Sequence, residues 1–383
     1  MSTALGNRTD NSDTWLYPDQ VFDGQNLMHG TAVCCVNGKV TALSATDAVP
    51  HGALVHKVPG LLTPGFFDIQ INGGGGVLYN TSPTPEGLFT IAAAHRQYGT
   101  TALLPTVITD APHVLEEAAE AMKDAFGKQG IQGIHIEGPH ISVARKGTHE
   151  ASWVCQLNPN SLKLVRDLRD RNIPVLMTVA PEGVAKGDIA KLVEMGVVVS
   201  IGHTDVGAAQ IKPALEEGAT LFTHLFNGMS QMANREPGAV GTGINSTAYC
   251  SLIVDGHHVA DDMLLLAMRA RPVKDHMIII SDAMPTVGGP DAFDLYGQNI
   301  RLDAGKLVNS EGSLAGAHTT MFDSLAHVVN VLERPTEEAL RMTLSNPAKL
   351  MGLEQPVARL QGADLSNVLL IANDYKSVSF LSA

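Results

Sequence analysis

The sequence is poor in cysteine, with four among 383 residues, and no two of them show the C-x-x-C spacing of a metal or redox site. Cys34 and Cys35 are adjacent, which disfavours a bond between them. Residues 7–13 are polar and lack the apolar core of a secretory signal peptide. These absences predict reduced thiols and a cytoplasmic location.

Long apolar runs and a basic excess are also missing. No stretch approaches the roughly 20 apolar residues that a membrane helix needs. The chain has 26 Lys and Arg against 39 Asp and Glu, a net charge of -13, which argues against a nucleic-acid surface. A local cationic pocket can still bind a small phosphorylated molecule. We therefore expect no nucleic-acid partner and no membrane partner.

The order of apolar and polar segments predicts an α/β protein. Residues 15–58 alternate short apolar runs with turns, as a small β-domain does. After residue 61 the pattern becomes apolar strand, loop and amphipathic helix, which predicts a (β/α)8 barrel of the TIM type. The eight expected strands span residues 62–70, 101–107, 133–137, 175–180, 197–202, 220–224, 251–255 and 277–282.

The segment after the last expected strand predicts a return to the first domain. Residues 285–312 are rich in turn residues, and helical patterns follow over 319–332 and 336–351. Short strand patterns at 367–371 and 377–381 come last. We therefore expect a small β-sandwich domain formed from both chain ends, residues 1–60 and 360–383, around a barrel at 61–359.

The first expected barrel strand ends in Gln70-Ile71-Asn72. Many metal-dependent hydrolases of this fold carry His-x-His there, and those histidines help to bind a second metal. Neutral amides are poor ligands for a zinc-type ion, so the sequence predicts fewer metals than the fold allows. The four glycines at 73–76 lack the Lys-Ser/Thr of a P-loop, and we expect them to form a mobile rim of the site.

Four other strand ends carry side chains suited to metal chemistry. In such a barrel the catalytic residues gather at the C-terminal ends of the strands. Glu137, His203 and His224 offer one carboxylate and two imidazoles and leave open coordination for water. Asp282 is expected to stand nearby as a base. This donor set favours zinc, although iron(II), cobalt and manganese also accept it.

Several short motifs carry a resemblance that spans about residues 58–351. The chain resembles the N-acetylglucosamine-6-phosphate deacetylase family of the amidohydrolase superfamily. The motifs that carry it are Pro64-Gly65-Phe66-Phe67-Asp68, His135-Ile136-Glu137-Gly138-Pro139, Lys146-Gly147-Thr148-His149, Gly202-His203-Thr204, Thr223-His224-Leu225-Phe226-Asn227, Arg235-Glu236-Pro237-Gly238, Asp255-Gly256-His257-His258 and Ser281-Asp282-Ala283.

The resemblance implies a role for each matching residue. Gln70 and Asn72 place the chain with single-metal relatives, so one divalent ion per subunit is expected. Gly228 stands where relatives more often have alanine, and a backbone contact would survive that change. The implied roles are metal ligation by Glu137, His203 and His224, catalysis by Asp282 and His149, and substrate binding by His149, Asn227, Gly228, Arg235 and His258.

The implied reaction is hydrolysis of the acetamide of N-acetyl-D-glucosamine 6-phosphate in amino-sugar catabolism, by a homodimer in which Arg235 reaches the neighbouring subunit's site. Two alternatives remain open. One is a related deacetylase acting on N-acetylgalactosamine 6-phosphate or an N-acyl amino acid. The other is a non-catalytic binding protein of the same fold, which the intact set of ligands and base disfavours.

Overall fold

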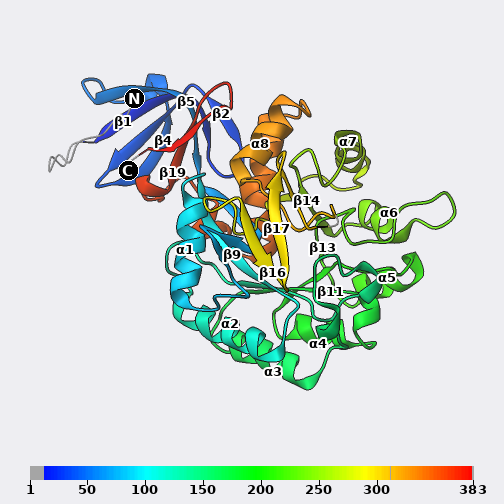
Figure 1. The fold of residues 1–383 in the computed structure, drawn as a ribbon. Helices are drawn as coiled ribbons and strands as arrows, with labels where there is room; N and C mark the ends of the chain where they lie inside the picture. Colours follow the sequence, from blue (N-terminus) through cyan, green and yellow to red (C-terminus); the bar gives the residue numbers. More distant parts are fainter. Residues whose placement is uncertain (1–12, 311, 382–383) are drawn as a thin grey trace.

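A computed structural model describes residues 13–310 and 312–381, and it contains the expected barrel (Figure 1). Eight parallel strands follow the order β15-β14-β13-β12-β11-β10-β9-β6, and a parallel bridge between Ile71 and Ala283 links the two end strands. The predicted fold class is confirmed. The barrel strands are β6 (Phe66–Ile71), β9 (Thr100–Ile108), β10 (Ile134–Glu137), β11 (Val175–Val179), β12 (Val198–Ile201), β13 (Leu221–Phe222), β14 (Tyr249–Ile253) and β15 (Met277–Ile280).

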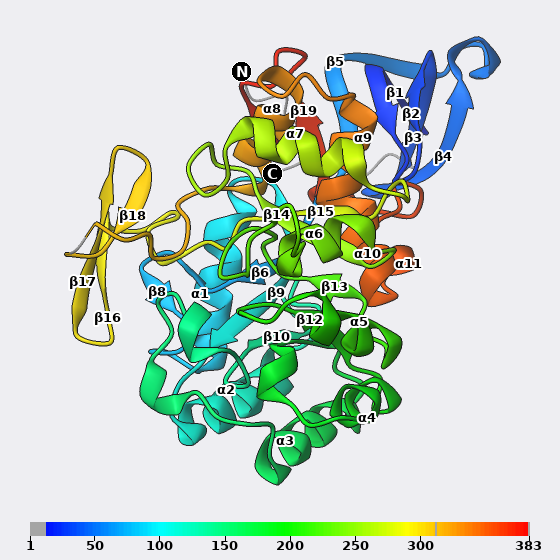
Figure 2. The ribbon, with the colours of Figure 1, turned by 90° about the vertical axis from the view of Figure 1, so that its right-hand side faces the viewer.

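Helices cover the outside of the barrel, and their starts follow from local sequence (Figure 2). The Thr84 side chain accepts a 3.1 Å hydrogen bond from Gly87 N, and Pro85 opens the helix where no amide donor is needed. Asn158 and Pro159 do the same for α3. The outer helices are α1 (Pro85–Arg96), α2 (Pro112–Ala125), α3 (Pro159–Arg169), α4 (Asp188–Glu194), α5 (Ala208–Glu216), α6 (Gly238–Asn245), α7 (Asp261–Ala270) and α8 (Met321–Asn330).

The first barrel strand starts later than its sequence pattern predicts. The apolar run divides at Gly65, so β5 (Leu54–Pro64) belongs to a different sheet and β6 begins at Phe66. A Cβ at Gly65 would lie 2.1 Å from the Thr101 side chain, so only glycine fits this crossing. Both halves of the run are buried, and a continuous apolar pattern therefore hides the change of sheet.

Strands from both ends of the sequence form one seven-stranded sheet beside the barrel (Figure 1). The C-terminal strand β19 (Val368–Ile371) pairs antiparallel with β5, as the pattern of the tail predicts. The domain boundaries at residues 60 and 360 stay a prediction, and residues 1–12 lie outside the described chain. The other strands of this sheet are β1 (Thr14–Phe22), β2 (Leu27–His29), β3 (Thr31–Val36), β4 (Lys39–Ala45) and β20 (Val378–Phe380).

The turn-rich segment after β15 contains a three-stranded sheet that the sequence analysis missed. Strands β16 (Ala292–Leu295), β17 (Gln298–Asp303) and β18 (Lys306–Val308) stand out from the barrel in Figure 2. Their apolar side chains pack with Ile108 and Met284 at the barrel mouth. The strands are short and separated by two-residue turns, so turn residues dominate the pattern.

Among the helices of residues 13–310 and 312–381, none has the length and apolar composition needed to cross a bilayer.

Candidate active site

A cavity of about 180 Å³ lies at the C-terminal ends of the barrel strands and contains most of the predicted chemistry. Loops after β10, β12, β13, β14 and β15 bring its polar side chains together from positions far apart in the sequence. The predicted site residues that line it are Glu137, His149, His203, His224, Asn227, Gly228, His258 and Asp282.

The three predicted metal ligands converge on one point. Nε2 of His203 and Nε2 of His224 lie 3.1 and 2.9 Å from Oε1 of Glu137, and 3.1 Å from each other. All three side chains are buried. Burial alone would raise the pKa of Glu137, but its hydrogen bonds with the two imidazoles hold that pKa well below its usual range.

The hydrogen bonds on the far side of these rings fit a metal. Nδ1 of His203 lies 2.7 Å from the carbonyl oxygen of Arg145, and Nδ1 of His224 lies 3.1 Å from that of Asn227. A carbonyl oxygen only accepts, so each ring carries a proton on Nδ1. With a divalent cation bound, each Nε2 would present its lone pair to the ion beside the Glu137 carboxylate.

His149 lies close enough to form an alternative ligand set. The potential ligand atoms of Glu137, His149 and His203 are all within 4.8 Å of one another. However, Nδ1 of His149 faces the backbone N–H of Thr109 at 3.3 Å, and an N–H only donates. Burial, followed by the charge of His203, lowers the pKa of His149 to about 3. The ring is therefore neutral with its proton on Nε2, which makes that atom a donor towards the cavity.

Asp282 is held by amides of the first strand. Nδ2 of Asn72 donates to its Oδ1 at 2.7 Å, and Nε2 of Gln70 donates to the same oxygen at 3.1 Å. Gln70 also donates to both carboxylate oxygens of Glu137 at 3.2 Å. Burial, and then the negative charge of Glu137, raise the pKa of Asp282. Gln70 therefore joins the base to a ligand, whereas Asn72 holds the base alone.

Three of these residues have a left-handed backbone. The φ angles are +46° at His203, +34° at His224 and +49° at Asp282. Non-glycine residues rarely adopt this region, and the strained conformations that do occur concentrate at functional sites. In each case the turn follows directly after a barrel strand and aims the side chain at the cavity.

Asn227 and His258 line another part of the cavity. Nδ2 of Asn227 is buried and has no partner within the described residues. Nδ1 of His258 lies 2.6 Å from Oδ2 of Asp255, and both side chains are largely buried. Oδ1 of Asp255 also accepts the backbone N–H groups of His257 and His258 at 2.8 and 2.9 Å. The Asn227 amide can therefore donate to an oxygen of a ligand, and Asp255 orients the His258 ring.

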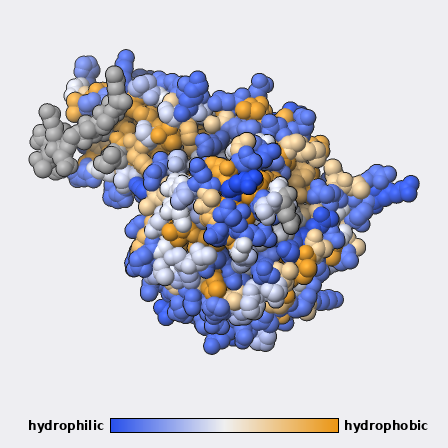
Figure 3. All heavy atoms as spheres, in the orientation of Figure 1, coloured by the Kyte–Doolittle hydropathy of each residue, from blue (hydrophilic) through white to orange (hydrophobic). Residues whose placement is uncertain are grey.

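Arg235 does not reach the cavity of its own chain. It is exposed, and it lies in the segment before α6, which extends away from the barrel in Figure 1. The same projection is covered by hydrophilic residues in Figure 3. Glu236 anchors its base by accepting the N–H groups of Ala208 and Gly238 at 2.9 and 3.0 Å.

The expectation of a mobile glycine rim is wrong. Residues 73–76 do not line the cavity, and Gly73 and Gly74 are buried. Backbone hydrogen bonds of 2.8–2.9 Å join Gly73, Gly75 and Gly76 to the segment after β15. Nε2 of His95 also lies 2.9 Å from the Gly73 carbonyl. These glycines allow close packing of the backbone rather than motion.

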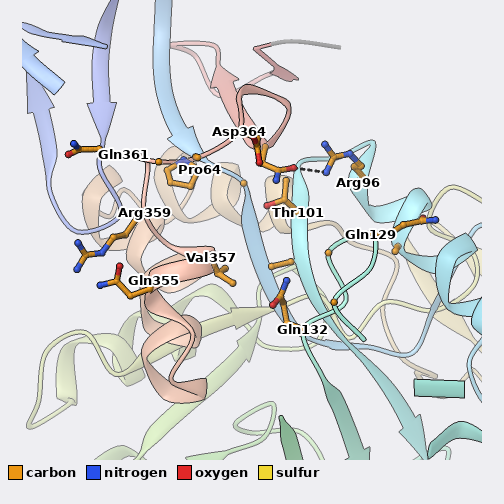
Figure 4. Close-up of a pocket in the computed structure, with 18 of the residues that line it drawn as sticks. Pro64, Arg96, Thr101, Gln129, Gln132, Gln355, Val357, Arg359, Gln361 and Asp364 are labelled. Atoms are coloured by element: carbon orange, nitrogen blue, oxygen red, sulfur yellow. Dashed lines mark hydrogen bonds between the residues drawn. The ribbon is translucent and has the colours of Figure 1, made fainter. Parts of the chain in front are cut away.

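The larger cavity in Figure 4, about 620 Å³, has no such chemistry. It lies beside Pro64 and Gly65, away from the strand ends that carry the predicted residues. Its two arginines, Arg96 and Arg359, lie on opposite sides in Figure 4, and Arg96 donates to Asn367 at 3.0 Å. They do not converge on one ligand, so we assign the chemistry to the smaller cavity.

Sequence reasoning missed two residues that orient the predicted ones. Thr109 bonds His149 through both its hydroxyl, at 2.7 Å, and its N–H. The sequence does not indicate this contact, because Thr109 follows a strand that is far from His149 in the chain. Asp255 lies three residues before His258, so its carboxylate can reach the ring within one turn. This spacing could have predicted the pair from the sequence.

Comparisons with known proteins agree with the motifs. The amidohydrolase family matches residues 61–362, which confirms the resemblance. An N-acetylgalactosamine-6-phosphate deacetylase of Shewanella sp. (strain ANA-3) is 37% identical over 355 residues, 89% of this chain and 88% of that protein. An N-acetylglucosamine-6-phosphate deacetylase of Haemophilus influenzae is 30% identical over 83% of this chain and 84% of its own.

Solved structures give the same picture. The N-acetylglucosamine-6-phosphate deacetylase of Pasteurella multocida superposes with a TM-score of 0.86 at 29% identity, over 97% of this chain and 98% of its own. A mutant of the Mycobacterium smegmatis N-acetyl-D-glucosamine-6-phosphate deacetylase, in complex with N-acetyl-D-glucosamine-6-phosphate, superposes with a TM-score of 0.87 at 28% identity. The match covers 97% of this chain and 100% of that chain.

Proposed function

Because this chain belongs to the amidohydrolase family, we propose that it hydrolyses the acetamide of N-acetyl-D-glucosamine 6-phosphate to D-glucosamine 6-phosphate and acetate. The chain is a hydrolase of carbon–nitrogen bonds. The relatives and structures named for deacetylation of amino-sugar phosphates cover most of its length, which supports this substrate.

One observation carries the proposal. A carboxylate and two imidazoles meet within 3.1 Å, beside an amide-held aspartate and a histidine donor. Glu137, His203 and His224 would hold one divalent metal, and zinc is our first assignment. When bound, such an ion supplies Lewis-acid chemistry by lowering the pKa of water to about 7 and polarising the carbonyl.

Asp282 and His149 carry the proton transfers and the charge stabilisation. Asp282 takes the proton of the attacking water as the new carbon–oxygen bond forms. Nε2–H of His149 donates to the carbonyl oxygen as negative charge develops there. Asp282 then gives the proton to the sugar nitrogen as the carbon–nitrogen bond breaks. The raised pKa of Asp282 suits a group that must both accept and return a proton.

Phosphate binding requires a second copy of the chain. Asn227, Gly228 and His258 would contact the sugar phosphate from within the cavity. Arg235 is exposed outside this cavity, so we propose that it enters the site of the neighbouring subunit of a homodimer. Its planar guanidinium offers paired donors to a phosphate dianion. A cytoplasmic location fits this metabolic role and remains a prediction.

The second candidate substrate is N-acetylgalactosamine 6-phosphate, the C4 epimer of the glucosamine substrate. The 37% identical relative carries the name of a galactosamine deacetylase, whereas the 30% identical one carries that of a glucosamine deacetylase. N-acetylgalactosamine 6-phosphate therefore belongs in every assay.

Metal analysis of the purified protein, beside acetate release from both epimers, tests the proposal. We expect one metal per chain and a higher kcat/KM for the glucosamine epimer. Asp282→Asn should keep the metal and lose about 10²- to 10⁴-fold in kcat, the usual contribution of a general acid and base. If the metal-loaded protein releases acetate from neither epimer, the proposed function is refuted. Near-normal turnover by Asp282→Asn would show that Asp282 is not the general acid and base.

A further inference from the structure

The side-chain oxygen of Asn72 is buried beside the proposed base and has no hydrogen-bond partner. Asn72 is 2% exposed and lines the catalytic cavity, and its Oδ1 accepts no hydrogen bond within residues 13–310 and 312–381. An unpaired buried oxygen destabilises a folded protein, so each one in a native structure needs an explanation. A donor on the bound substrate would provide one.

Asp282 fixes the orientation of the Asn72 amide. Nδ2 of Asn72 lies 2.7 Å from Oδ1 of Asp282 and 3.4 Å from the carbonyl oxygen of the same residue. A carbonyl oxygen only accepts, so the atom that faces Asp282 is the nitrogen of the amide. Rotating the amide would set its oxygen against both oxygens of Asp282. The unpaired atom is therefore an acceptor in every state of the site.

The position of this acceptor selects one group of the substrate. Both ends of a carboxamide belong to one small planar group, so Oδ1 of Asn72 stays close to the Asp282 carboxylate that Nδ2 contacts. In the proposed reaction Asp282 gives its proton to the sugar nitrogen, which must therefore come within hydrogen-bond reach of the carboxylate. That nitrogen carries an N–H, the one donor of the acetamide. This N–H is the donor that approaches Oδ1 of Asn72.

A second unpaired amide atom supports the match. Nδ2 of Asn227 is also buried and without a partner among the described residues, and it lines the same cavity. The two side chains thus offer one acceptor and one donor. The amide N–H of the substrate can only donate, and its phosphate oxygens can only accept. The acceptor of Asn72 suits the N–H, whereas the donor of Asn227 suits an oxygen of the sugar phosphate.

We infer that Oδ1 of Asn72 accepts the N–H of the scissile amide, and that this bond makes the enzyme selective for secondary amides over esters. The inference rests on the proposed function. As the carbon–nitrogen bond breaks, its electron pair stays on the nitrogen and takes the proton from Asp282. The original N–H remains on the nitrogen throughout. Holding this N–H at Asn72 turns the electron pair towards Asp282.

The selectivity follows from what replaces the N–H. An ester has an oxygen at this position, so two acceptors would face each other in a buried site. A site that bonds a substrate N–H rejects an analogue that lacks it, because the buried partner is left unpaired. A methylene group avoids the repulsion but also leaves Oδ1 of Asn72 unpaired. Affinity should therefore fall in the order NH, CH₂, O.

Three analogues test this order. Each has a methylphosphonyl group in place of the acetyl group, joined to C2 of the sugar 6-phosphate by NH, CH₂ or O. The phosphonyl group and the 6-phosphate are common to all three, so their contacts largely cancel in a ratio of inhibition constants. We expect the metal-loaded protein to bind the NH analogue about tenfold or more tighter than the O analogue. Equal inhibition constants would overturn the inference.

Two variants show whether the preference comes from Asn72. In Asn72→Ala the NH and O analogues should bind within about threefold of each other. Gln70→Ala is the matched control, because Gln70 also donates to Oδ1 of Asp282, at 3.1 Å, but its loss leaves the oxygen of Asn72 in place. This control should keep the tenfold preference. A preference that survives in Asn72→Ala, or that Gln70→Ala abolishes equally, would contradict the inference.

The outcomes separate this inference from the proposed function. If the protein releases acetate from the acetamide but binds the three analogues alike, the inference fails and the deacetylase function stands. If the metal-loaded wild-type protein neither releases acetate nor binds any of the analogues, the proposed function itself fails.

Discussion

The side-chain amide of Asn72 donates a 2.7 Å hydrogen bond to Oδ1 of Asp282. Asn72 follows β6 and Asp282 follows β15, and these two strand ends meet where the barrel closes. Gln70 donates to the same oxygen and to Glu137. The first strand therefore supplies hydrogen bonds rather than metal ligands, and these bonds orient the proposed base.

Asn72→Ala should slow the reaction without removing the metal. A hydrogen bond to a charged group contributes about 1.5–3 kcal/mol, so kcat/KM should fall by about 10- to 100-fold. The lost donor stabilised the ionised form of Asp282. Burial and the charge of Glu137 already raise the pKa of Asp282, and the substitution should raise it further. The acid limb of the pH–rate profile should move to higher pH. An unchanged limb would show that Asn72 does not act through Asp282.

Two substitutions distinguish the overlapping ligand sets. His224→Ala should lose most of the bound metal, because Nε2 of His224 lies 2.9 Å from Glu137. His149→Ala should keep the metal and lose about 10²- to 10³-fold in kcat, as expected for a donor to the developing oxyanion. Metal content and kcat are measured on the same samples. The reverse pattern would make His149 the ligand.

Arg235→Ala should weaken binding of the phosphorylated substrate far more than binding of the unphosphorylated sugar. A charge-assisted pair contributes about 1.5–3 kcal/mol, so kcat/KM for the phosphorylated substrate should fall about 10- to 100-fold. Mixing Arg235→Ala with inactive Asp282→Asn chains tests its action across the dimer. Hybrid dimers would hold one site with both groups intact and regain activity, whereas no gain on mixing would place Arg235 in its own chain's site.

The strand-end rule made most of this site predictable from sequence. Glu137, His203 and His224 converge because parallel strands deliver their C-terminal ends to one face. The tautomer of His149 was not predictable, since it depends on Thr109, 40 residues away in the chain. The left-handed turns at His203, His224 and Asp282 carry no residue signature either, because the surrounding fold imposes them on ordinary side chains.

The β16–β18 sheet shows another limit of prediction from the sequence. Strands of three to six residues are too short for their periodicity to stand out among turns, so residues 285–312 gave no strand prediction. Gly65 hid a sheet boundary for the opposite reason, because both sides of it are equally apolar. Local pattern fails where an element is very short or where burial is uniform.

Asp255 gives a prediction about stability and substrate affinity together. Its carboxylate accepts from Nδ1 of His258 at 2.6 Å and from two backbone N–H groups. Burial opposes ionisation, but these hydrogen bonds lower the pKa of Asp255 to about 2 from an ordinary 3.8. Since the folded pKa is the lower one, the contribution is present above pH 3.8 and is lost as the pH falls towards 2.

Asp255→Asn should therefore reduce the free energy of unfolding by about 2 kcal/mol at pH 7, and the difference from wild type should shrink only below pH 4. The amide cannot accept from Nδ1 of His258 through its NH₂, so the ring should move its proton to Nε2 and lose its ionised partner. We expect KM for the phosphorylated sugar to rise about tenfold with kcat within about twofold. Urea unfolding at several pH values and steady-state kinetics measure both effects. A stability difference that stays constant down to pH 3, or a loss confined to kcat, would show that Asp255 does not hold His258 for the substrate.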